Sequence, residues 1–177
     1  YIFDDNTMTL FPRMASMEER HQQAYKSWVD IKGRKVKVRK RDGSEEYIQV
    51  PTFGENLKFF FKYQLNHMYW RYFMWNFAGK QNDIQGYGNK MDGNWISGLP
   101  FYDNLRLGDQ SLLPDFYKNH KARNTYYMLP FLLGFIGVFY HYRKDKNNFL
   151  VAMLMFLLSG IAIVVYLNEV PITPRER

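Results

Sequence analysis

Two long apolar runs near the C-terminus constrain the fold of this chain more than any other feature. Residues 125–142 read TYYMLPFLLGFIGVFYHY without a fixed charge, and residues 149–167 read FLVAMLMFLLSGIAIVVYL. A helix of about 18 residues spans roughly 27 Å, close to the thickness of the hydrocarbon core of a bilayer. Tyrosines lie at both ends of the first run, as in interfacial aromatic belts. The sequence therefore predicts two transmembrane helices, over 125–142 and 149–167.

The connection between the two runs predicts their orientation. Residues 143–148 contain three basic residues and one acidic residue, a net charge of +2. Short basic loops stay on the cytoplasmic side, so residues 1–124 and 168–177 are expected on the periplasmic side of a bacterial inner membrane. A buried helical hairpin in a globular domain is the alternative, but the rest of the chain is too polar to cover two such helices on all sides.

Composition excludes several kinds of site. The 177 residues include no cysteine, so a disulfide framework, a thiolate metal site and a cysteine nucleophile are excluded. The four histidines stand apart from one another and from carboxylate clusters, so no metal site is expected. No cofactor motif is found, since residues 86–90 (GYGNK) lack the spacing of a phosphate-binding loop. The start, YIFDD, is no signal peptide, and both ends look cut, so we expect an internal fragment of a larger protein.

A β-hairpin is predicted over residues 36–50. Two alternating runs flank Asp42 and Gly43, and Asp-Gly is the strongest short-range hairpin signal. A two-residue turn would place Lys40 opposite Glu45, which pairs opposite charges. A basic strand is also compatible with binding nucleic acid or anionic lipid, although a solvated hairpin neutralised by its own partner strand explains the same residues.

Helices are predicted on both sides of the hairpin. Ser16 with Glu19, and Thr52 with Glu55, are candidate capping boxes. The second helix, over 52–78, holds ten aromatic residues interrupted by lysine, histidine and arginine. This mixture favours an interfacial helix at the membrane boundary or packed against the spanning helices. Carbohydrate or lipid contact is the next alternative, and a nucleic-acid stacking platform is the least favoured.

Residues 79–124 are rich in glycine, proline, asparagine and aspartate and are predicted to form functional loops. Arginine offers a planar fork to phosphate, and aromatic faces suit sugars. The candidate phosphate-binding residues are Arg71, Arg106, Arg175 and Arg177. The candidate sugar or acceptor contacts are Trp95, Tyr102, Asp103 and Asp109. For the last two arginines, anchoring to anionic headgroups or pairing with Glu176 is the slightly preferred interpretation.

Several segments carry a resemblance to a known family, namely YKSWVDIKGRKVKVRKRDG, FFFKYQLNHMYWRYFMWNFAGKQNDIQG, GNWISGLPFYDNLRLGDQ, KARNTYYMLPFLLGFIGVFYHYRKD and PITPRER. Together they resemble DUF2723, large inner-membrane proteins of Bacteroidetes grouped with protein O-mannosyltransferase-like enzymes. The resemblance implies a polytopic membrane glycosyltransferase of the C type. It also implies an acidic catalytic residue in an early outer loop, and no position here corresponds to that residue.

Two classes of function follow. In the first, the chain is part of a glycosyltransferase that moves a sugar from a polyprenyl-phosphate carrier to hydroxyls of exported proteins. Its partners would be membrane lipids, the lipid-linked sugar and the protein acceptor, with no nucleic acid, and the candidate arginines would hold the donor phosphate. In the second, the chain is a non-enzymatic, membrane-anchored interaction or assembly protein. The expected fold class is a transmembrane helical hairpin with a periplasmic α+β region.

Overall fold

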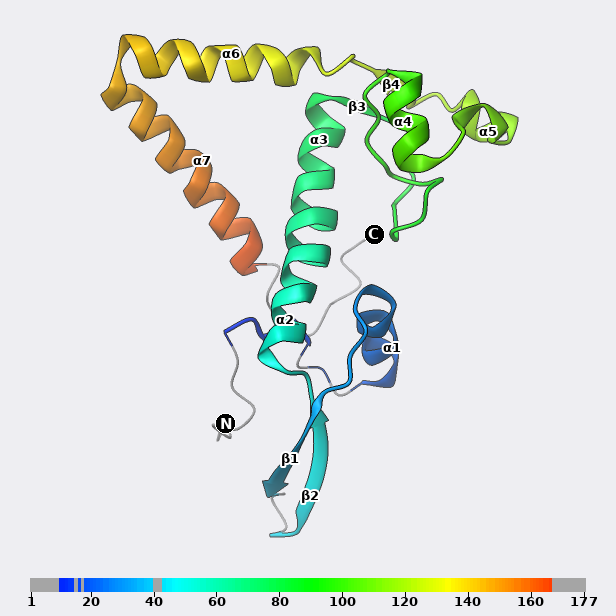
Figure 1. Ribbon diagram of the computed structural model, residues 1–177, viewed down its shortest axis with the longest axis vertical. Coiled ribbons are helices and arrows are strands. Elements are labelled where there is room, and N and C mark those ends of the chain that lie inside the picture. The colour runs from blue at the N-terminus through cyan, green and yellow to red at the C-terminus, as the bar shows by residue number, and fades with distance from the viewer. Residues whose placement is uncertain (1–9, 15, 17, 40–42, 167–177) are drawn as a thin grey trace. The chain divides into compact units, whose positions relative to one another are not determined.

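The computed structural model describes residues 10–14, 16, 18–39 and 43–166, with the side chains of the last helix described up to Gly160. The chain divides into two compact units. The first comprises the residues up to Asn66 together with the end of the last helix from Ala162, and the second spans His67–Ile161. The described residues form an α+β structure of helices and two small antiparallel sheets (Figure 1).

The first unit contains a β-hairpin between helices. Its elements are η2 (Pro12–Met14), α1 (Glu19–Trp28), β1 (Arg34–Arg39), β2 (Glu45–Val50), α2 (Phe53–Phe59) and the start of the π-helical segment η3 (Phe60–Trp70). The strands pair in antiparallel register with Arg39 opposite Glu45. Residues 40–44 therefore connect the strands, and the expected two-residue turn with Lys40 opposite Glu45 is wrong, because the connection is longer than that turn allows.

The two predicted helix starts have different outcomes. Thr52 caps α2 in a complete capping box, in which the Glu55 backbone N–H donates to the threonine hydroxyl and the Glu55 carboxylate accepts from the Thr52 backbone N–H. The predicted cap at Ser16 is wrong. Helix α1 begins at Glu19 without a side-chain cap, and the Ser16 hydroxyl instead bonds the Nδ1 atom of His21 at 2.8 Å.

Glu55 also fastens the chain that enters β1. Its Oε1 atom accepts hydrogen bonds from the backbone N–H groups of Lys32 (2.7 Å) and Gly33 (3.1 Å), while its Oε2 atom accepts from Thr52. Burial disfavours the charged carboxylate, but the bonds from Thr52, Lys32 and Gly33 outweigh it and lower the pKa of Glu55 to about 2. Glu55 thus joins the helix start to the hairpin as a carboxylate.

Aromatic side chains form the core of the first unit. Tyr25 of α1 is 2% exposed and meets the edge of Phe59, which is 1% exposed, with ring centroids 5.5 Å apart. Tyr63 continues the cluster, 5.0 Å from Phe59 and 4.9 Å from Trp28. The inward-facing part of the aromatic segment is therefore buried against α1.

The second unit places a loop-rich segment between helices. Its elements are α3 (Arg71–Phe77), β3 (Gly79–Lys80), α4 (Pro100–Leu107), η4 (Gln110–Leu112), α5 (Asp115–Lys118), β4 (Asn124–Thr125), α6 (Leu129–Lys144) and α7 (Lys146–Tyr166). Strands β3 and β4 pair antiparallel. Met74, Ala78 and Trp95 form a buried cluster, on which Met128 and Phe131 pack.

The expected transmembrane hairpin is wrong. In the part of the chain that the structure describes, no helix is both long and apolar enough to cross a membrane. Helix α6 is 16 residues long, roughly 24 Å, and its last turn includes Arg143 and Lys144. It starts at Leu129 because Asn124–Thr125 pairs with β3 and because Tyr127 and Met128 adopt positive φ angles of 50° and 57°.

The second predicted span has the same outcome. Helix α7 (Lys146–Tyr166) has 21 residues, with side chains described up to Gly160, and its described part is also not a helix that could cross a membrane. An inner-membrane location with residues 1–124 in the periplasm depended on these two spans. That location is contradicted by the same finding.

Part of the aromatic segment packs against α6 and α7. The Phe73 ring lies 6.3 Å from the ring of Phe131 on α6 and 6.0 Å from that of Phe156 on α7, in edge-on contacts. Other rings of the segment remain open to solvent, with Tyr72 59% and Phe77 43% exposed. The segment is thus a packed helix on one side and an exposed aromatic surface on the other.

Candidate functional site

Helices α6 and α7 expose an unusually large apolar surface. The large apolar side chains on them that are at least about a third exposed are Leu129, Leu132, Leu133, Phe135, Ile136, Val138, Phe139, Tyr140, Tyr142, Leu150, Val151, Leu154, Met155, Phe156, Leu157 and Leu158. We call this set the hairpin surface. Monomeric proteins rarely leave contiguous apolar patches of more than a few hundred Å² uncovered. The hairpin surface is therefore the strongest candidate for an interaction site.

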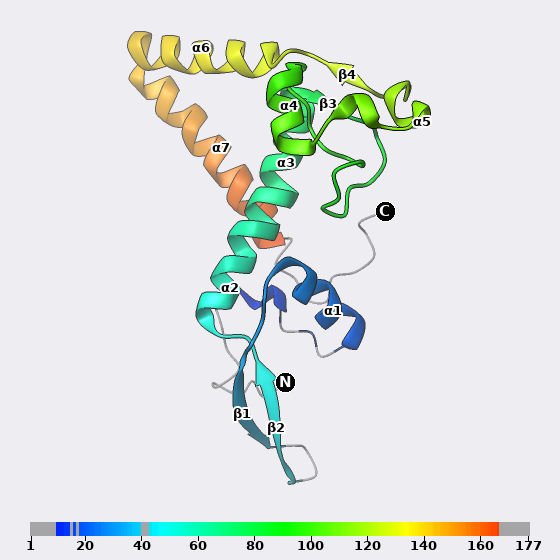
Figure 2. The same ribbon diagram turned by 45° about the vertical axis from the view of Figure 1, so that its right-hand side comes forward.

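The geometry of the two helices keeps this surface open. Figures 1 and 2 show α6 and α7 diverging from their short connection. Near that connection the rings of Tyr142 and Phe149 meet at 5.2 Å. A Cβ atom placed at Gly134 or Gly137 would meet no atom within 4 Å. One side of α6 is therefore free for close approach by another helix.

The structure brings together four of the residues that the sequence singled out. The guanidinium carbon of Arg106 lies 3.7 Å from the ring centroid of Trp95, and Arg106 also donates to the Trp95 carbonyl oxygen. Tyr102 lies beside Trp95, with ring centroids 5.9 Å apart. Burial lowers the pKa of Arg106, and the negative charge of Asp103 opposes that shift. Trp95, Tyr102, Asp103 and Arg106 form one cluster, but the arginine is already engaged by the tryptophan.

Asp103 fastens a loop within this cluster. Its side chain is 5% exposed, and Oδ1 accepts from the Ser97 backbone N–H (2.8 Å) and hydroxyl (3.0 Å). Oδ2 accepts from the backbone N–H of Gly98 at 2.9 Å. Three donors occupy the carboxylate, so its role in this structure is to hold residues 97–98 against the first turn of α4. Contact with a sugar stays a prediction.

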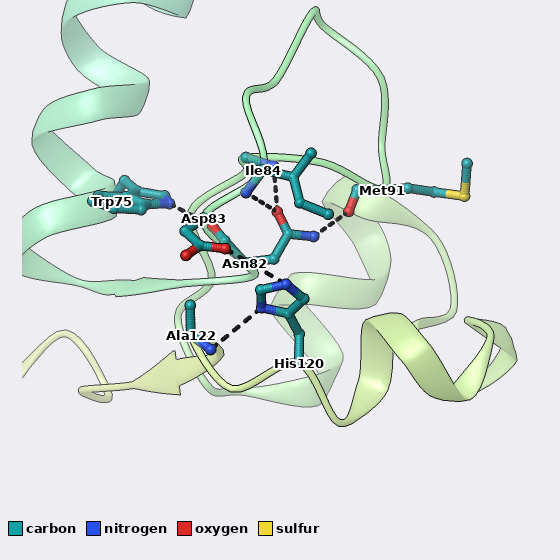
Figure 3. Close-up of polar contacts among 8 residues, drawn as sticks. Trp75, Asn82, Asp83, Ile84, Met91, His120 and Ala122 are labelled. Carbon is teal, nitrogen blue, oxygen red and sulfur yellow. Dashed lines mark hydrogen bonds and ion pairs between the residues drawn. The ribbon is translucent and has the colours of Figure 1, made fainter. Parts of the chain in front are cut away.

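A polar network around Asn82 shapes the loop that precedes Trp95 (Figure 3). Asn82 is fully buried, and its side-chain Oδ1 accepts from the backbone N–H of Gly93 at 2.8 Å. Its Nδ2 donates to the Met91 carbonyl at 2.9 Å, and its own carbonyl accepts from the Trp75 indole at 3.1 Å. Gly93 has φ +61° and a Cβ there would lie 2.5 Å from the Gly86 nitrogen. The network therefore depends on glycine at that position.

The pair Asp83 and His120 has the composition of an acid–base dyad but not the geometry. The Nε2 atom of His120 lies 3.5 Å from an Asp83 carboxylate oxygen, and Nδ1 accepts from the Ala122 backbone N–H at 3.3 Å (Figure 3). An Nδ1 acceptor places the proton of the neutral ring on Nε2. Both ring nitrogens thus have partners within the protein. This pair links two loops.

Of the other predicted site residues, the structure describes Arg71 and Asp109. Arg71 is half-buried, donating through Nε to the His67 carbonyl at 2.9 Å and through its guanidinium to the Gly93 carbonyl. Asp109 caps η4 by accepting from the Ser111 backbone N–H. Arg175 and Arg177 lie outside the described residues. Their expected phosphate-binding role stays a prediction.

The pKa of His67 lies below its ordinary value. Burial and the neighbouring positive charge of Arg71 lower its pKa to about 4, against the opposing effect of its hydrogen bond to the Gly86 carbonyl at 3.1 Å. The ring is therefore neutral at physiological pH. Its contact ties the helical segment to the loop that contains Gly86.

Sequence reasoning missed the residues that organise these loops. Gln81 and Asn82 are both fully buried, yet amides in a segment rich in glycine and asparagine resemble ordinary turn residues. Only the tertiary fold reveals that they face inward. Among the described residues, no group of three or more histidines and carboxylates is arranged to hold a metal ion.

Comparison with known proteins gives one family. A family of unknown function, DUF8416, matches residues 1–61, which is 61 of the chain's 177 residues. Comparison with curated proteins and with solved structures finds no match. The resemblance to DUF2723 and to glycosyltransferases is therefore wrong, since the matching family is a different one.

Proposed function

We propose that this chain is a non-enzymatic assembly protein that associates with a second copy of itself through the hairpin surface on α6 and α7. The single observation that carries the proposal is the exposure of large apolar side chains along both helices. Leu133 is 58% exposed and Ile136 is 62% exposed, although both are residue types that proteins bury. A surface of this kind is stable in water when another apolar surface covers it.

A second copy fits this surface better than a charged partner. Residues 129–140 of α6 contain no charged side chain, so a complementary surface must be equally apolar. The same hairpin on another copy supplies one, and two helical hairpins make a four-helix bundle. An antiparallel arrangement would keep the basic connections at 143–146 at opposite ends of the bundle. Gly134 and Gly137 would permit close helix contact at the interface.

The proposal is tested by measuring the mass of the whole chain in solution. Light scattering after size exclusion should give twice the 21.3 kDa of one chain. Leu133→Glu with Ile136→Glu should raise the dissociation constant by at least about 100-fold, because two unpaired carboxylates would be buried in an apolar interface. The matched control is Leu105→Glu on α4, where the leucine is 78% exposed outside the hairpin surface; it should leave the mass unchanged.

Two results would contradict the proposal. One is a monodisperse monomer in the absence of detergent at concentrations well above micromolar. The other is a chain recovered only in detergent micelles, with one copy in each micelle. Sugar transfer was expected solely from the DUF2723 resemblance and stays a prediction without a supporting observation.

A further inference from the structure

A second surface, in the first unit, has the features of a peptide-binding groove. An open groove of about 730 Å³ lies between the end of α1 and the outer side of α2 and η3. Trp28 and Val29 line one wall, and Leu57 and Phe61 line the other. That volume lies within the range typical of ligand sites. Every residue lining the groove belongs to the first unit, so the groove and the hairpin surface have no residue in common.

The helical wall carries an apolar row beside a basic row. Leu57 and Phe61 are four residues apart and so are neighbours along the helix, and Lys58 and Lys62 repeat that spacing one residue on. Both lysines are exposed. Asp30 lies at the opposite wall and is the acidic side chain among the residues that line the groove. A ligand with an apolar stripe and negative charge beside it complements this arrangement.

We propose that this groove binds an amphipathic helix of a partner protein that carries acidic residues beside its apolar stripe. The lining runs from Gly54 to Asn66, through α2 into the π-helical segment η3, a stretch of about three turns that matches about three turns of a bound helix. Apolar residues at i, i+3, i+4 and i+7 of the partner would meet Leu57, Phe61 and Trp28, as in other helix-in-groove complexes. Its carboxylates would lie near Lys58.

Gly54 offers a position at which a substitution can fill the groove and so test whether it binds a ligand. Gly54 lies in the first turn of α2, and a Cβ atom there would meet no atom within 4 Å. Its φ angle is not in the left-handed region, so larger side chains fit its backbone. Gly54→Trp therefore places an indole in the open groove without disturbing the core. Gly54→Ala is the matched control, because it changes the helix start without filling the groove.

The test uses the whole chain and two fluorescein-labelled helical peptides of about 14 residues, three to four turns of helix. Both have leucine at i, i+3, i+4 and i+7, with glutamate at the flanking positions in one and lysine in the other. Fluorescence anisotropy should show the glutamate peptide binding at least about 10-fold more tightly, with the difference shrinking as salt is added. Gly54→Trp should weaken binding by at least about 10-fold, and Gly54→Ala should match the wild type.

Reversing the charge of the two groove lysines provides a second test of the proposal. Lys58→Glu with Lys62→Glu should reverse the preference between the two peptides, because the variant presents carboxylates where the wild type presents ammonium groups. Far-UV circular dichroism of each variant, identical to the wild type, shows that the fold is retained. Leu133→Glu should bind the glutamate peptide as the wild type does, so failure of the assembly proposal and failure of this one are distinguishable.

Three outcomes would overturn the proposal. The first is equal binding of the two peptides or a preference for the lysine peptide. The second is unchanged binding to Gly54→Trp. The third is a groove that takes dodecanoate, measured by displacement of anilinonaphthalene sulfonate, and neither peptide, which would assign it to a small anionic amphiphile instead.

Discussion

Replacing Glu55 by glutamine tests how the first unit is held together. The Glu55 carboxylate accepts from the backbone N–H groups of Lys32, Gly33 and Thr52 and from the Thr52 hydroxyl. Glutamine keeps one oxygen acceptor but loses the charge and the second acceptor. We therefore expect the hairpin entry at residues 32–33 to open more often while the aromatic core stays intact.

The free energy lost in Glu55→Gln can be estimated in two ways. The pKa of Glu55 falls from 4.5 to about 2, and a shift of that size corresponds to about 3 kcal/mol between the two charge states. Because Glu55 is only half-buried, screening by solvent reduces that contribution to about 1–2 kcal/mol. Losing about half of four hydrogen bonds, each contributing about 0.5–1.5 kcal/mol net, gives a similar range. We therefore expect the equilibrium constant for local opening of residues 32–33 to be about 5- to 30-fold larger in Glu55→Gln than in the wild type.

Hydrogen exchange followed by mass spectrometry measures that opening directly. Peptides that contain Lys32 and Gly33 should lose protection by the stated factor in Glu55→Gln. Thr52→Ala, the matched control, should loosen the start of α2 by about 1 kcal/mol and leave those two amides largely protected. Protection at Lys32 and Gly33 that is the same in Glu55→Gln and wild type would refute the reasoning.

The pH dependence of the same amides has a defined sign. The folded pKa of Glu55 lies below its ordinary value, so its stabilisation is complete above about pH 5 and is lost as the pH falls toward 2. Protection factors, corrected for the intrinsic pH dependence of exchange, should therefore fall over that window in the wild type. In Glu55→Gln they should not change with this titration.

Three further changes probe the second unit. Asp103→Asn should destabilise the 97–98 loop by about 2–4 kcal/mol, because an amide nitrogen cannot accept the bonds that the buried carboxylate accepts, and exchange at those amides measures it. The pKa of His67 is about 4 in the folded protein, against an ordinary 6.5. The contribution of the neutral ring to stability is therefore complete above pH 6.5 and is lost as the pH falls to 4. His67→Gln should flatten the curve of stability against pH over that range. Arg106→Lys should lose the planar stacking on Trp95, seen as altered tryptophan fluorescence, and lower the melting temperature of the second unit by a few degrees.

Local sequence signals identified several features of the structure because their causes are local. The alternation around Asp42 and Gly43 placed a β-hairpin where β1 and β2 pair, and the Thr52 capping box is present as expected. The register was missed, because the length of the connecting loop depends on where pairing ends. The cap at Ser16 was missed, because its hydroxyl has a competing partner in His21.

The candidate site was predictable only in part. Trp95, Tyr102, Asp103 and Arg106 were singled out by residue type, and they do come together around α4. What each atom does there could not be read from the sequence, since hydrogen-bond partners come from residues brought near by folding. In this structure the Asp103 carboxylate holds a loop and the Arg106 guanidinium stacks on an indole, while their expected contacts with a sugar and a phosphate stay predictions.

The sequence by itself determined that the C-terminal part is helical and apolar, because a run of leucine, phenylalanine and isoleucine carries that property wherever it lies. Tertiary structure decided where those helices begin and end. Asn124–Thr125 pairs with Gly79–Lys80 at the position where the first span was expected to start. Tyr127 and Met128 adopt left-handed backbone conformations, so the helix begins only at Leu129. A non-local strand pair therefore outweighed a local helix signal, since backbone hydrogen bonds made to a distant segment are invisible to any pattern read along the chain.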